Sequence, residues 1–127
     1  MVASPYSLEH LSNTQLLESL ASINARTARL TADLLAHLAE VDARTLYLEQ
    51  GFSSLFAYCL HLGYSEGEAA KRIQAARAAR SYPVLFEKIA AGELHLSAVN
   101  LLAPHLDGPH GTQLIAAAIG KTKRQVE

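Results

Sequence analysis

Mostly apolar residues recur in alternating steps of four and three along the first third of the chain. They are Leu16, Leu20, Ile23, Thr27, Leu30, Leu34, His37 and Val41, widened by Leu17 and Leu38. This spacing places the side chains on one face of an α-helix. Ser12 and Gln15 have the form of a capping box, and no proline or glycine interrupts residues 13–50. The pattern predicts one long helix over residues 12–44, with a break near Asn24 left open.

Shorter apolar segments, separated by helix-stop residues, follow the long helix. Residues 45–51 end it or form a short extra turn, with Gly51 as the stop. Further helices are expected at 55–62 behind Ser53 or Ser54, at 65–81 behind a second capping box, and at 83–91, 96–103 and 112–119. Glycines and prolines supply the intervening breaks.

These elements predict an all-α fold in a single domain of 127 residues. We expect an N-terminal arm over 1–11, the long helix over 12–44 and a helical bundle over 53–119. Residues 121–127 resemble the opening of a further helix, which suggests a fragment or trimmed chain. Alanine and leucine supply most of the 50% apolar content, and aromatic residues reach only 6%, which favours helices over sheets.

The overall charge argues against a global attraction to nucleic acid or to an anionic membrane. The formal net charge is -1, so any contact with DNA requires a local patch. The sequence shows neither a signal-peptide pattern nor a run of about 20 apolar residues. The single cysteine, Cys59, forms no internal disulfide. We therefore expect a cytoplasmic protein without a membrane contact.

Residues 55–79 resemble a helix-turn-helix, whose second helix is the candidate for DNA recognition. That helix carries Lys71, Arg72, Arg77 and Arg80, and no acidic residue lies between Glu68 and Glu87. The four side chains do not share one narrow face, because Arg72, Arg77 and Arg80 spread over about 140° and Lys71 points elsewhere. The alternative is that they serve packing or internal ion pairs. A second pair of this kind covers residues 85–102.

The residues that carry catalysis or hold metals form no recognisable centre. The six histidines include no adjacent pair and no HExxH spacing. Cys59 and His61 lie about 200° apart on a helix, so they do not share a metal. Ser12, Ser53, Ser65 and Ser97 are interpreted as helix caps, and His37 as a core or interface histidine. We expect no metal, no cofactor and no catalysis in this chain.

Segments spread over most of the chain resemble a known domain type. They are residues 34–44, 51–59, 68–77, 92–97 and 120–127, and together they are similar to the helical domain that precedes HNH nuclease modules in many bacterial proteins. The resemblance implies a DNA-binding or positioning domain. The paired histidines, asparagine and metal-ligating histidine of an HNH site are absent, so any nuclease activity belongs to a longer parent protein.

Two functional hypotheses follow. In the first, the chain binds DNA phosphates without sequence preference through Lys71, Arg72, Arg77, Arg80, Lys121, Lys123 and Arg124. In the second, it is an oligomerisation or protein-interaction module that does not contact nucleic acid. Its homodimer seam comprises Leu16, Leu20, Ile23, Leu30, Leu34, His37 and Val41, with Thr27 at a seam position. The same stripe is also compatible with packing lengthwise on the C-terminal helices as core.

Overall fold

Helix α1 runs unbroken over Asn13–Arg44, as the apolar spacing predicts, and it has no break at Asn24. The Ser12 hydroxyl accepts a hydrogen bond from the Gln15 backbone N–H (3.1 Å), and the Gln15 side chain accepts one from the Ser12 N–H (3.0 Å). This capping box satisfies two N–H groups that a helix start otherwise leaves unpaired. The helix ends at Thr45, whose backbone is left-handed with φ 52°.

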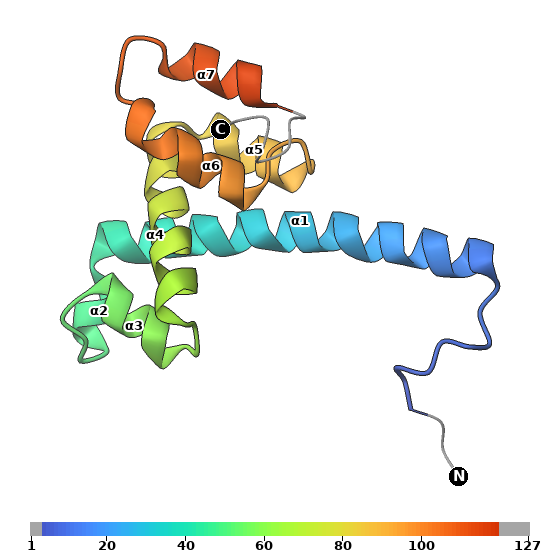
Figure 1. The fold of residues 1–127 in the computed structure, drawn as a ribbon. Helices are drawn as coiled ribbons and strands as arrows, with labels where there is room; N and C mark the ends of the chain where they lie inside the picture. The colour runs from blue at the N-terminus through green and yellow to red at the C-terminus, as the bar shows by residue number, and fades with distance from the viewer. Residues whose placement is uncertain (1–3, 120–127) are drawn as a thin grey trace.

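The computed structural model describes residues 4–119 and shows no strand among them, so the fold is all-α (Figure 1). After α1 come α2 (Leu46–Glu49), α3 (Leu55–His61), α4 (Glu66–Ser81), α5 (Val84–Ala90), α6 (Leu96–Leu102), the 3₁₀ turn η1 (Ala103–His105) and α7 (Gly111–Ala118). Over this range, no helix combines the length and the apolar character that crossing a bilayer requires.

The predicted caps are partly confirmed. Ser54, not Ser53, caps α3 by accepting a hydrogen bond from the Ala57 N–H, and Ser65 forms a capping box with Glu68 at the start of α4. The prediction for Ser97 is wrong, because it lies inside α6, which His95 precedes without a side-chain cap. The described residues end at 119, so the helix expected at 121–127 lies outside them.

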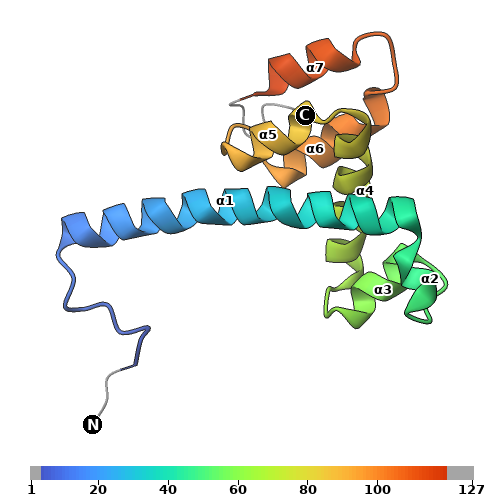
Figure 2. The same cartoon turned by 180° about the vertical axis from the view of Figure 1, so that it is seen from behind.

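Helix α4 crosses α1 near the C-terminal end of α1 (Figures 1 and 2). Helices α5, α6 and α7 gather at one end of α4, and α2 and α3 lie at the other. We call α2 to α7, residues 46–118, the body. The N-terminal half of α1 projects away from the body in both views.

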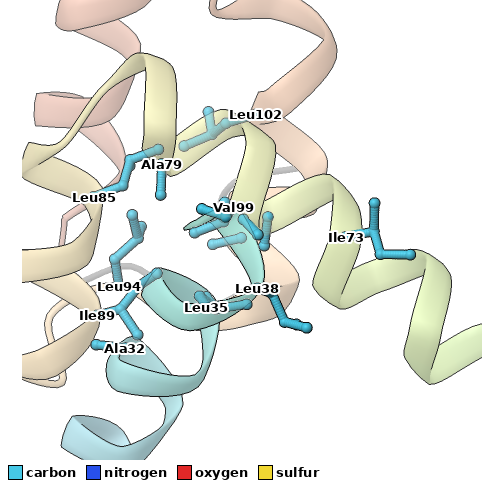
Figure 3. Packing of buried hydrophobic residues seen from close by; sticks show 14 of the residues in the cluster. Ala32, Leu35, Leu38, Ile73, Ala79, Leu85, Ile89, Leu94, Val99 and Leu102 are labelled. Atoms are coloured by element: carbon cyan, nitrogen blue, oxygen red, sulfur yellow. The ribbon is translucent and has the colours of Figure 1, made fainter. Parts of the chain in front are cut away.

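The core is formed where α1, α4, α5 and α6 meet (Figure 3). Leu35, Leu85, Leu94 and Val99 are buried there to 1% exposure or less. The alanines of the buried face of α4 have small side chains that let neighbouring helices approach closely; they are Ala69, Ala75, Ala76 and Ala79. The core thus fixes the C-terminal half of α1 on the body and leaves its other half free.

Candidate functional site

The projecting half of α1 is the most exposed regular element of the described chain. Every residue from 13 to 27 is exposed, although the segment carries several large apolar side chains. Their exposed fractions are 40% for Leu16, 66% for Leu17, 61% for Leu20 and 49% for Ile23. A row of apolar side chains in water, held on one rigid helix, is typical of an interaction surface.

The predicted seam and the core-facing side of α1 are two different faces. The body covers Ala32, Leu35, Leu38 and Ala39, whose directions centre roughly 110° around the helix axis from the seam. Leu30 therefore remains 67% exposed although it lies between Ala28 and Ala32, which contact the body. Packing within the chain therefore leaves most of the seam exposed.

The seam residues differ in how far the body shields them. Leu16, Leu20, Ile23, Thr27, Leu30 and His37 are exposed, whereas Leu34 and Val41 are half-buried. The expected packing of the long helix on the C-terminal helices is seen only from residue 28 onward. The side chains that make it are those of Leu35 and Leu38 more than those of the seam. Of the two interpretations of His37, the core one is wrong, because the residue is exposed and its Nδ1 lies 2.6 Å from the Asp33 carbonyl oxygen. The interface interpretation stays a prediction.

Arg77 does not stand free on α4. Its Nε lies 2.9 Å from Oδ2 of Asp42 and its Nη2 3.2 Å from Oδ1, a two-point ion pair between α4 and α1. The hydrogen bond with Asp42 raises the pKa of Arg77 above its ordinary value. Because the guanidinium is charged in any case at neutral pH, the consequence is structural: the pair joins the two longest helices.

Arg72 and Arg80 also have partners within the chain. The Arg72 guanidinium lies 4.8 Å from the centre of the Tyr64 ring, in a cation–π contact, and 3.7 Å from a Glu68 carboxylate oxygen. Arg80 donates to the Ala39 carbonyl oxygen (3.3 Å) and lies 3.8 Å from Glu40. Internal ion pairing was one alternative for these arginines, but Asp42 and Tyr64 were not identified as the partners. The Arg77–Asp42 contact spans 35 positions, so no local pattern indicates it.

Of the other predicted phosphate contacts, only Lys71 belongs to the described residues 4–119. Lys71 is exposed on a different side of α4, and Lys121, Lys123 and Arg124 lie outside the described residues. The face of α4 that the other helices leave open carries Ala70, Gln74 and Ser81 besides Arg77. Lys71 and Arg80 are exposed on other sides of the same helix, so the cations of α4 do not gather on this one face.

This open face of α4 forms one wall of a groove of about 810 Å³. Its other walls come from Leu55 and Phe56 of α3 and from Pro104 and Leu106 after α6. A second groove of about 510 Å³ lies between the middle of α1 and the turn from α5 to α6. The first groove contains one carboxylate, that of Asp107. The second contains one histidine, His95, together with Arg29 and Arg72. Neither lining, as described over residues 4–119, holds a pair of carboxylates or of histidines.

No group of three histidine, cysteine or acidic side chains among the described residues is placed to hold a metal ion. Cys59 is fully buried, and burial raises the pKa of its thiol, which keeps it neutral and unreactive at neutral pH. His61 instead stacks with Phe52 and Tyr58 at the surface.

Comparison with known proteins finds no relative of this chain. The chain matches no protein-family model, no curated protein and no solved structure. The resemblance to the helical domain that precedes HNH modules therefore stays a prediction, based on the segments quoted above.

Proposed function

We propose that this chain is a helical self-association module that acts through the seam of α1. The observation that carries the proposal is the exposure of the seam: Leu20, Ile23 and Leu30 are each about half exposed or more, on a helix whose other face already holds the core. Because these side chains are already partly covered by their own helix, burying the rest of one stabilises a complex by roughly 1–2 kcal/mol before the costs of association. The heptad spacing supports a helix as the partner.

The test is the molar mass of the chain as a function of its concentration, measured by sedimentation equilibrium. We expect a monomer–dimer equilibrium in the wild type. Leu30→Lys should shift it to monomer, because a charge would enter an apolar interface. Leu48→Lys is the matched control: Leu48 is 56% exposed on α2, away from the seam, and its replacement should leave the equilibrium unchanged. A wild type that stays monomeric at every concentration would rule the proposal out.

DNA contact through α4 is the second candidate function. Arg77 and Arg80 keep 60% and 52% of their side-chain surface exposed despite their ion pairs, and no acidic residue lies between Glu68 and Glu87. A DNA phosphate would have to compete with Asp42 for Arg77 and with Glu40 for Arg80. The geometry therefore favours self-association as the primary function.

A further inference from the structure

The two sides of the seam carry different residues. On the side away from the body, heptad spacing aligns Ser19, Arg26, Asp33 and Glu40, and on the side towards it, Leu17, Asn24, Thr31 and Leu38. Arg26 and Asp33 are exposed and form no ion pair within residues 4–119. An unpaired cation and an unpaired anion thus stand seven residues apart on one edge of an apolar stripe.

The orientation of a second copy decides whether these charges meet. In a parallel, in-register pair of helices, Arg26 faces Thr31 of the second copy and Asp33 faces its Leu38, so neither charge is matched. In an antiparallel pair, residues of this edge face the same edge of the other helix. Arg26 then faces Asp33 of the second copy, and symmetry forms the ion pair twice.

We propose that the partner of α1 is a second copy of this chain, bound antiparallel with Arg26 of each copy beside Asp33 of the other. The proposal rests on the self-association proposed above and adds its orientation and register. The same register sets Leu16 against Val41, Leu20 against His37, Ile23 against Leu34, and Thr27 against Leu30.

Leu17 supplies a second, independent reason for this orientation. It is 66% exposed but points towards the side of α1 on which the body lies, not towards the seam. An antiparallel partner carries its own body alongside residues 13–20 of the first copy, on that same side. Residues 21–31 there already face the turn from α5 to α6 of the first copy itself. In a parallel pair, both bodies lie at the C-terminal ends of α1, and Leu17 stays in water.

The first experiment exchanges the two charges one at a time. Arg26→Glu and Asp33→Arg are prepared as separate full-length proteins, and each should self-associate roughly tenfold more weakly than the wild type, because like charges meet at both symmetric contacts. An equimolar mixture should recover an affinity within about threefold of the wild type, because both contacts of the mixed pair are then opposite in sign. A parallel pair predicts no recovery.

Matched controls come from the same helix. Glu18 and Arg29 are exposed and lie outside both edges of the seam. Glu18→Arg and Arg29→Glu repeat the charge changes away from the proposed contact, and each should leave the dissociation constant within about twofold of the wild type. Equal weakening by these controls would attribute the effect to net charge and overturn the proposed ion pair.

The second experiment measures orientation directly, by pulsed electron spin resonance between nitroxides on Thr14→Cys or on Arg29→Cys. With a rise of about 1.5 Å per residue, the antiparallel register separates the two Thr14 positions by roughly 44 Å along the helices and brings the two Arg29 positions within roughly 20 Å. Cys59 is fully buried, and wild type treated with the same nitroxide reagent verifies that Cys59 does not react.

The outcomes separate the two proposals. A long distance at position 14 with a short one at 29, together with recovery on mixing, supports the antiparallel pair. Dimers with short distances at both positions overturn the orientation while self-association stands. A chain that remains monomeric in sedimentation overturns self-association, and the antiparallel pair with it.

Discussion

The guanidinium of Arg77 donates two hydrogen bonds to the carboxylate of Asp42, with nitrogen–oxygen distances of 2.9 and 3.2 Å. The Asp42 side chain is only 19% exposed, so the ion pair is shielded on one side. Two-point geometry of this kind makes an ion pair stronger than an average surface pair. It also ties α4 to α1 at the point where the two helices cross.

Removal of this pair should weaken the fold measurably. We expect Arg77→Ala and Asp42→Asn each to lower the free energy of unfolding by about 1 kcal/mol, as measured by urea denaturation. The double variant should be less destabilised than the sum of the two, because each single change already removes the same contact. Fully additive losses would mean that Arg77 and Asp42 contribute independently.

The two faces of α1 should respond differently to truncation. Leu35 is completely buried, so Leu35→Ala should cost about 3 kcal/mol of unfolding free energy. Leu20→Ala removes a side chain that is 61% exposed and should change the stability of the monomer by less than about 0.5 kcal/mol. The same change should raise the dissociation constant of the dimer. Urea denaturation at low concentration and sedimentation separate the two effects; a large loss of monomer stability in Leu20→Ala would contradict them.

Much of the fold could be predicted from local patterns. The long helix, both capping boxes and the glycine stops depend on residues within four positions of one another. Ser12 and Ser65 were therefore correctly predicted as helix caps. Which face of α1 the body covers was not predictable, since the seam stripe and the Leu35–Leu38 stripe are both apolar. The partners of Arg77 and Arg80 were not identified, because Asp42 and Glu40 lie on another helix.

The DNA hypothesis makes a prediction of its own. If α4 binds phosphates, fluorescence anisotropy should show duplex binding at low salt that falls steeply as salt is raised. Lys71→Ala should then weaken binding without a loss of stability, because Lys71 forms no ion pair within residues 4–119. The arginines are less suited to this test, since their removal also disturbs contacts with α1. Absence of binding at low salt would leave self-association as the sole candidate.

The capping box at the start of α4 should make stability depend on acid pH. Hydrogen bonds from the backbone N–H and side chain of Ser65 hold the pKa of Glu68 below its ordinary value. A carboxylate with a lowered pKa in the folded state stabilises the fold fully above its unfolded pKa, near 4.3, and this contribution is lost as the pH falls through the folded pKa. The wild type should therefore lose stability below about pH 4.5.

Glu68→Gln tests this assignment, because glutamine keeps the cap acceptor and removes the charge. We expect the variant to unfold at lower urea than the wild type at pH 7 and at similar urea at pH 3. Glu66→Gln is the control, since Glu66 lies in the same turn but accepts no side-chain hydrogen bond from the described residues. If Glu68→Gln still unfolds at lower urea than the wild type at pH 3, the effect comes from the geometry of the side chain and not from its charge.

Two glycines should respond in opposite directions to the addition of one methyl group. A Cβ at Gly67, in the first turn of α4, would meet no atom within 4 Å, so Gly67→Ala should stabilise the fold by about 0.5 kcal/mol by restricting the unfolded chain. A Cβ at Gly111 would collide with the Leu106 carbonyl oxygen, which also accepts the hydrogen bond of the Tyr82 hydroxyl.

Gly111→Ala must therefore move the backbone of the loop before α7 or break the Tyr82 contact. We expect a loss of about 1–3 kcal/mol in the free energy of unfolding, measured by thermal or urea denaturation. Gly108→Ala serves as the control in the same loop, because its Cβ would lie 3.4 Å from the nearest atom, the His105 carbonyl oxygen. Equal losses at both positions would mean that the loop responds to lost flexibility, whereas a loss at Gly111 alone identifies the close approach of Leu106 as the cause.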